Sequence, residues 1–130
     1  MPYYVVQRLM SALNTRRKSL AGSRVLVLGV AYKNDIDDMR ESPAIKVIDL
    51  LLESEAEVVY HDPYVPDYHE DGHDIAYVDL TEDELGKADA VLIITGHRNV
   101  DYDLVVRSAD LILDTRNALA SFDSNKVIRL

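Results

Sequence analysis

The stretch that most constrains the fold of this chain is VLVLGVAYKNDIDDMRESPA, residues 25–44. It begins with aliphatic residues only, which is typical of a strand buried on both faces of a parallel sheet. Gly29 ends that run, a charged loop follows, and Ser42-Pro43 has the form of a helix start with a hydroxyl N-cap. The stretch therefore predicts a strand, a long loop and a helix. Since ligands of open α/β sheets bind beyond the carboxyl ends of the strands, this loop is the first candidate site.

The rest of the chain continues the alternation of strands and helices. Apolar residues at helical spacing predict a helix over residues 2–18, and a further helix is expected over 101–107. Thr81 with Glu84 three residues later predicts a short helix that ends near Gly86. Strands are predicted over residues 25–28, 57–61, 75–78, 90–95, 111–113 and 126–130. Residues 67–74 lack periodicity and are expected to form a loop. This order predicts an α/β, Rossmann-like three-layer sandwich, with a mainly parallel sheet of five or six strands and helices on both faces.

Charge and composition exclude several classes of function. The formal net charge of −9 argues against nonspecific binding to nucleic acid or anionic membranes, which depends on basic patches. No apolar run approaches the length of a membrane span, and MPYYVVQRLM lacks the basic start and apolar core of a secretory signal. We therefore expect a cytoplasmic protein without nucleic-acid or membrane partners. The chain has no cysteine, which excludes a thiolate metal site and a cysteine nucleophile.

Two cations follow predicted strands and are candidates for binding an anion. Lys33 lies four residues after Gly29, where its ammonium can pair with a phosphate and the ring of Tyr32 can lie along a base or sugar. The alternative is an exposed lysine beside a packing tyrosine. Arg116 follows Asp114 at the end of another strand, where a guanidinium can bind phosphate or ribose. Its alternative is an ion pair with Asp114 or another neighbour.

Other patterns give weaker predictions. Gly29 is followed by Val-Ala-Tyr-Lys, so the G-x-G-x-x-G fingerprint is absent, and Asp62 after the second strand is too little to predict NAD in its ordinary Rossmann position. His97 either lines the predicted crevice or caps the fourth strand. No serine or threonine has a plausible base, so no catalytic residue is expected. We also expect no metal, because no zinc-type spacing relates the candidate ligands His61, Asp62, Asp67, His69, Asp71 and His73.

The segment GVAYKNDIDDMRESPA resembles the start of the C-terminal domain of the UDP-glucose/GDP-mannose dehydrogenase family, the NAD-dependent nucleotide-sugar 6-dehydrogenases. PYYVV, ALN, HDPYVP, ADAVLIITGH and LILDTRNAL extend the resemblance over most of the chain. It implies that residues 1–20 are a remnant of the central linking helix and that residues 21–130 are the UDP-binding domain. The YKxDIDDMRESPA wording is closer to enzymes of UDP-N-acetylhexosamines, such as UDP-N-acetyl-D-mannosamine 6-dehydrogenases, than to UDP-glucose enzymes.

The resemblance also implies roles for single residues. Tyr32 and Lys33 match the aromatic-lysine pair that contacts UDP, and Arg116 in DTRN matches the arginine that helps to hold the UDP-sugar. Arg40 matches an arginine that points across the domain interface toward NAD, although its acidic neighbours also fit a local salt-bridge network. The binding energy of these contacts would position the sugar for chemistry elsewhere.

The family oxidises C6 of a UDP-sugar in two NAD-dependent steps through a covalent intermediate on a cysteine. That cysteine and the NAD fingerprint belong to its N-terminal part. We therefore expect this chain to be inactive alone, with the N-terminal NAD-binding and central helical domains as its partners in a parent enzyme that is a homodimer or larger. The alternatives are a free-standing nucleotide-binding or regulatory module and a receiver-like signalling domain, although the latter would need an acidic pair after the first strand.

Overall fold

The computed structural model describes residues 2–32, 35, 40 and 42–130. Lys33 and residues 36–39 of the predicted loop lie outside the described residues. The helices and strands follow one another along the chain in this order: α1 (Pro2–Thr15), β1 (Arg24–Leu28), α2 (Pro43–Glu53), β2 (Glu57–His61), β3 (Tyr68–Glu70), β4 (His73–Tyr77), α3 (Glu82–Lys87), β5 (Ala90–Ile93), α4 (Tyr102–Ser108), β6 (Ile112–Asp114) and β7 (Val127–Arg129). Among the described residues, the helices are too short to span a membrane.

Within the described residues, seven strands form one sheet in the order β3-β4-β2-β1-β5-β6-β7. All neighbouring strands are parallel except β3 and β4, which pair antiparallel. From the central β1, the chain passes first to β2 on one side and later to β5 on the other. The carboxyl ends of β1 and β5 therefore form the topological switch point, where ligands bind in folds of this kind.

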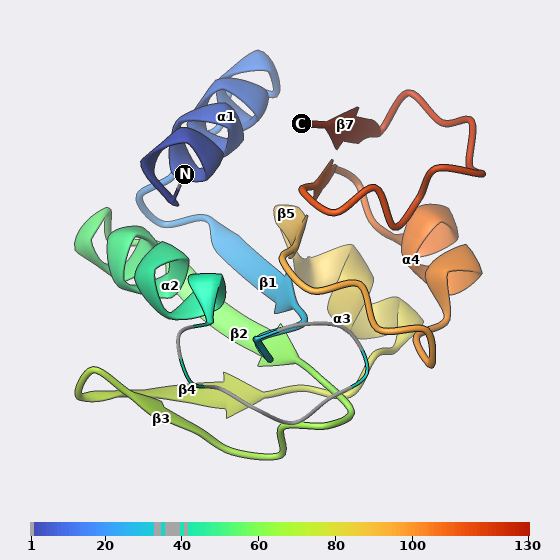
Figure 1. Cartoon of the computed structure of the whole chain (residues 1–130). Coiled ribbons are helices and arrows are strands. Elements are labelled where there is room, and N and C mark those ends of the chain that lie inside the picture. Colours follow the sequence, from blue (N-terminus) through green and yellow to red (C-terminus); the bar gives the residue numbers. More distant parts are fainter. Residues whose placement is uncertain (1, 33–34, 36–39, 41) are drawn as a thin grey trace.

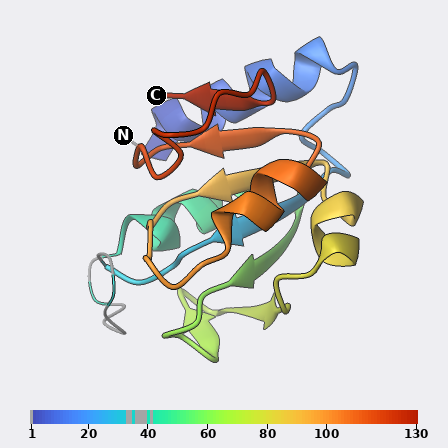
Figure 2. The same cartoon turned by 90° about the vertical axis from the view of Figure 1, so that its right-hand side faces the viewer.

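Helices cover both faces of the sheet, so the predicted three-layer α/β sandwich is confirmed (Figure 1). Because side chains alternate along a strand, β1 serves two cores. Val25 and Val27 belong to the core under α1 and α2, and Leu26 and Leu28 to the core under α3 and α4. The view turned by 90° shows α3 and α4 lying across the second face (Figure 2). The four aliphatic residues of β1 are at most 1% exposed, which explains their uninterrupted run.

The predicted start of the second helix is confirmed, and the predicted end of the first is wrong. The Ser42 side chain caps α2 by accepting the N–H of Ala44, and Pro43 is the first helical residue. α1 ends at Thr15 rather than residue 18, because Arg17 adopts the left-handed conformation (φ 61°). α1 packs against α2, and its apolar face belongs to the same core. The boundary between residues 1–20 and 21–130 stays a prediction.

The predicted loop over residues 67–74 is wrong, because this segment contains β3 and the start of β4. Asp71 and Gly72 join the two strands, and both have positive φ values, 52° and 77°. This combination is typical of a two-residue hairpin turn, for which Asp-Gly is a strong sequence signal. The hairpin explains why the sheet has more strands than the five or six predicted.

Candidate functional site

The segment that leaves β1 is fully buried and is fixed by its backbone. Gly29 has a φ of 86°, and a Cβ at this position would lie 2.2 Å from the carbonyl oxygen of Thr95. The N–H of Gly29 donates to the carbonyl of His61 at 2.9 Å. Val30 and Ala31 are completely buried. Glycine is therefore required here both for its φ and for the close approach of β1 and β5.

Asp62, which follows β2, is the polar centre of this segment. Its carboxylate is completely buried. Oδ2 accepts the N–H groups of Val30 (2.8 Å) and Ala31 (3.1 Å), and Oδ1 accepts the N–H of Tyr64 (2.8 Å). His97 contacts Oδ2 at 2.9 Å. Burial by itself raises the pKa of Asp62, but the hydrogen bonds from His97, Val30 and Tyr64 hold that pKa below its ordinary value.

His97, which follows β5, links Asp62 to the loop after β1. Nδ1 accepts the backbone N–H of Asp35 at 2.7 Å. The ring proton must then be on Nε2, which donates to Asp62, so the imidazole is neutral. Tyr64 packs on the ring with 4.7 Å between centroids, and the hydroxyl of Tyr102 donates to the His97 carbonyl. His97 is 1% exposed, so it connects the strand ends and does not face the crevice as a free base.

Two hydroxyl groups hold the carbonyl side of the same segment. Ser42 Oγ donates to the Val30 carbonyl at 2.6 Å, and Thr95 Oγ1 donates to the Ala31 carbonyl at 2.7 Å. Ser42 thus does more than cap α2. It also fixes the N-terminus of that helix against the end of β1.

We expect Ser42→Ala to lower the free energy of unfolding by about 2 kcal/mol, because an N-cap and a buried hydrogen bond are lost together. Thr81→Ala is the matched control, since Thr81 caps α3 without such a second contact, and we expect it to cost about 1 kcal/mol. Urea unfolding of both variants measures the difference. Equal losses would show that the contact with Val30 contributes nothing.

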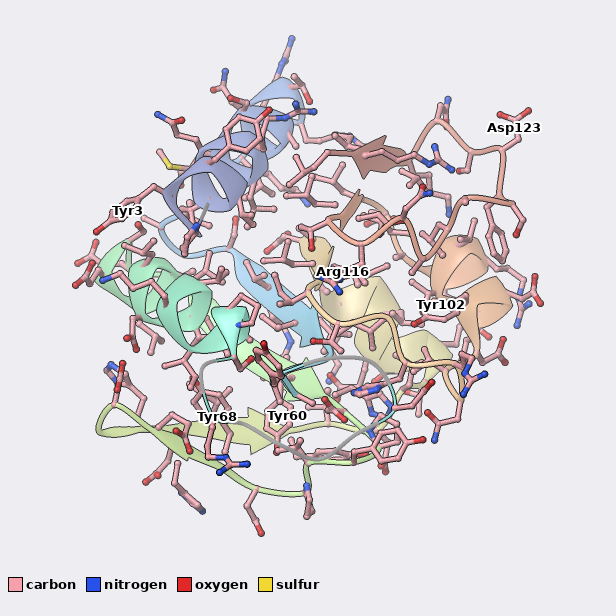
Figure 3. All side chains as sticks on the ribbon, in the orientation of Figure 1. Tyr3, Tyr60, Tyr68, Tyr102, Arg116 and Asp123 are labelled. Atoms are coloured by element: carbon pink, nitrogen blue, oxygen red, sulfur yellow. The ribbon has the colours of Figure 1, made fainter. Side chains whose placement is uncertain are left out.

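A cavity of about 450 Å³ opens at the carboxyl edge of the sheet. It lies between the first turns of α1 and α2 and the residues that follow β5, β6 and β7. Its lining residues are Pro2, Tyr4, Val5, Pro43, Val47, Ile94, Thr115, Arg116 and Leu130. Among these described residues Arg116 alone is charged. Figure 3 shows Arg116 near the middle of the molecule, well separated from Tyr102 on α4.

The surroundings of Arg116 favour an anion site over an ion pair. The Asp114 carboxylate accepts the backbone N–H groups of Arg116, Ala118 and Leu119, so it caps the turn after β6. The Arg116 side chain is exposed, and its guanidinium forms no hydrogen bond or ion pair with any residue in the described ranges. The first turn of α2 adds the positive end of a helix dipole beside the same cavity.

Of the predicted site residues that the structure describes, only Arg116 lies at the cavity. Tyr32, which follows the buried segment 29–31, is 46% exposed and is not among the residues that line the cavity. Lys33 lies outside the described residues. Arg40 is exposed and has interaction partners. The proposed contacts of these four residues stay predictions.

The described residues do not fit NAD in its ordinary Rossmann position. The acid expected to bind a ribose hydroxyl would be Asp62, but its carboxylate is buried and already accepts four donors. No group of three or more histidine or acidic side chains in the described part of the chain is arranged to hold a metal. His69 contacts Asp74, His73 contacts Asp49, and His61 contacts the carbonyl of Val78, each at a separate place.

Comparison with known proteins identifies the family. Residues 26–121 match the model of the UDP-glucose/GDP-mannose dehydrogenase family, UDP binding domain. This match covers well over half of the chain. The chain belongs to this family. The resemblance noted in its sequence is thereby confirmed, and the receiver-like alternative is set aside.

Relatives of this UDP-binding domain are whole dehydrogenases. The chain is 31% identical over 127 residues to a UDP-N-acetyl-D-mannosamine dehydrogenase of Methanococcus vannielii, which covers 92% of this chain and 28% of the relative. It is 42% identical over 90 residues to the UDP-glucose 6-dehydrogenase AglM of Haloferax volcanii, with 68% and 21% covered. The solved UDP-D-ManNAc dehydrogenase of Pyrococcus horikoshii superimposes with a TM-score of 0.79 at 29% identity, over 99% of this chain and 30% of that one. The chain thus spans less than a third of these relatives.

Sequence reasoning missed the polar cluster that lies at the carboxyl ends of β2, β1 and β5. It treated Asp62 as a possible ribose ligand and Ser42 as a helix cap only, and it gave Asp35 no role. The Arg98 side chain contacts the Asp35 carboxylate at 2.6 Å across a separation of 63 residues. No pattern of neighbouring residues in the sequence predicts such a pair. The available signal for the cluster was that hydrogen-bonding residue types follow three neighbouring strands.

Proposed function

We propose that this chain binds the UDP part of a UDP-sugar for an NAD-dependent nucleotide-sugar 6-dehydrogenase. The observation that carries the proposal is Arg116, an exposed guanidinium in a cavity at the carboxyl edge of the sheet, without an acidic partner among the described residues. A guanidinium there can bind a diphosphate bidentately, and the positive end of α2 adds to its field. The apolar remainder of the lining suits a base or sugar face.

The proposed UDP ligands are Tyr32, Lys33 and Arg116. Lys33 and Tyr32 follow Ala31, whose N–H and carbonyl are both held by buried side chains. Tyr32 and Lys33 therefore follow directly after a residue that is held in place at the switch point. Preorganisation of this kind reduces the entropy lost on binding.

For the parent enzyme, we propose oxidation of UDP-N-acetyl-D-mannosamine to its uronic acid, because relatives with that name align over most of this chain. NAD would bind mainly to an N-terminal domain, and Arg40 would contact it across the domain interface. This chain has no cysteine and no dinucleotide fingerprint, so we propose that it is inactive alone. The parent enzyme would be a cytoplasmic homodimer or larger assembly.

Calorimetric titration with UDP tests the proposed site, with UMP, GDP and NAD as comparison ligands. We expect selective binding of UDP that weakens by roughly 10- to 100-fold in Arg116→Ala and in Lys33→Ala, because each loses a charge-assisted contact of about 1.5–3 kcal/mol. Arg107→Ala is the matched control. It removes an exposed cation in the last turn of α4, which lies shortly before the start of β6 and therefore near the amino edge of the parallel strands.

The pattern across these variants decides the proposal. An unchanged affinity in Arg107→Ala together with losses in the other two supports a local diphosphate site. Equal losses in all three would show that only net charge matters. Tight NAD binding without UDP binding would overturn the assignment of this domain.

A further inference from the structure

We propose that His97 is the positioning residue for the part of the chain that contains Tyr32 and Lys33, because one neutral imidazole links Asp62 at the end of β2 to the backbone of Asp35. This inference rests on the proposed function for its ligand. It goes beyond that function by naming a residue that contacts no ligand and yet sets the affinity.

The two nitrogens of His97 act at the two ends of one short span. Through Asp62, Nε2 supports the N–H groups of Val30 and Ala31, and Nδ1 directly accepts the N–H of Asp35. Tyr32 and Lys33 lie between these anchor points in the sequence. Both ends of the span that carries them therefore depend on the same side chain.

Asp35 has the features of an imposed conformation. Its φ is 63°, a left-handed backbone that non-glycine residues adopt only at a cost. Besides its bond to His97, its carboxylate accepts the backbone N–H of Arg98 at 2.8 Å and the Arg98 Nε at 2.6 Å. Those contacts with Arg98 lower the pKa of Asp35. Strained residues of this kind persist where the surroundings over-determine them, and they concentrate at ligand sites.

Two substitutions separate the two hydrogen bonds of His97, one to Asp35 and one to Asp62. In His97→Asn, the amide oxygen can take the place of Nδ1 and accept the Asp35 N–H, but no atom reaches Asp62. In His97→Gln, the longer amide can donate to Asp62 from the place of Nε2, but the acceptor for Asp35 is lost. If His97 served only the stability of the core, UDP affinity would fall in the variant that loses thermal stability. If His97 is a positioning residue, one variant loses thermal stability and the other loses UDP affinity.

The test measures thermal unfolding, amide hydrogen exchange and UDP affinity for both variants of this chain. For His97→Gln we expect a melting temperature close to that of the wild type, faster exchange of the Asp35 amide and roughly tenfold weaker UDP binding. For His97→Asn we expect a lower melting temperature, a protected Asp35 amide and UDP affinity within about threefold of the wild type below its transition. Imidazole ¹⁵N shifts of the wild type should show the Nε2–H tautomer.

Each outcome decides between the two claims. UDP affinity that follows the melting temperature in both variants would overturn the positioning role, as would an Nδ1–H tautomer. If the wild-type chain does not bind UDP while Arg116→Ala behaves like it, the proposed function fails. The amide exchange of Asp35 in the two variants would still show whether His97 holds that span.

Discussion

Replacing Gly29 with alanine is expected to lower the free energy of unfolding by more than about 3 kcal/mol. The left-handed φ of 86° by itself costs an alanine about 1–2 kcal/mol. The new Cβ would also lie 2.2 Å from the carbonyl oxygen of Thr95 and 2.9 Å from its carbonyl carbon, so the backbones after β1 and β5 would have to move apart. Urea unfolding measures the loss, which is large compared with a typical stability of about 5–15 kcal/mol.

Gly22→Ala is the matched control for this prediction. Gly22 has nearly the same φ, 83°, but a Cβ there would meet nothing within 4 Å. We expect it to cost only the conformational part, about 1–2 kcal/mol. Because the two variants share the φ effect, their difference isolates the close approach at the switch point. Equal losses would show that β1 and β5 separate without strain.

The second large effect is expected for Asp62→Asn, which should cost about 3 kcal/mol of unfolding free energy. Oδ2 accepts three donors and Oδ1 accepts a fourth, all in a fully buried place. An asparagine has one oxygen, so in either orientation its NH₂ group faces a buried donor and leaves that donor without an acceptor. Asp74→Asn is the control, because its ion pair with His69 is exposed and contributes little.

The same carboxylate predicts a dependence of stability on pH. The pKa of Asp62 is lower in the folded chain than in the unfolded chain. Its contribution is therefore complete above the unfolded pKa of roughly 3.9 and is lost as the pH falls through the lower folded pKa. Below pH 4, the stability of the wild type should fall more steeply than that of Asp62→Asn. Parallel profiles would show that other carboxylates carry the acid response.

Local sequence patterns predict the alternation of strands and helices and the position of the central strand. The run from Val25 to Leu28 predicts burial on both faces because an exposed face would require polar residues at alternate positions. Ser42-Pro43 marks the start of α2 because capping and the φ of proline are local properties. Asp71-Gly72 is an equally local signal for a hairpin turn. The flanking strands were not predicted as a hairpin because their apolar and polar residues do not alternate.

The polar groups that meet around the end of β1 come from distant parts of the chain, and local patterns do not predict their contacts. Asp62 and Val30 are 32 residues apart, His97 and Asp62 are 35 apart, and Asp35 and His97 are 62 apart. The strand order β2-β1-β5 brings them together, and hydrophobic periodicity carries no information about that order. For Arg116 the sequence left an ion pair and an anion site equally open. The turn after β6 argues against an ion pair with Asp114, because its backbone N–H groups occupy that carboxylate, and the anion site at Arg116 stays a proposal.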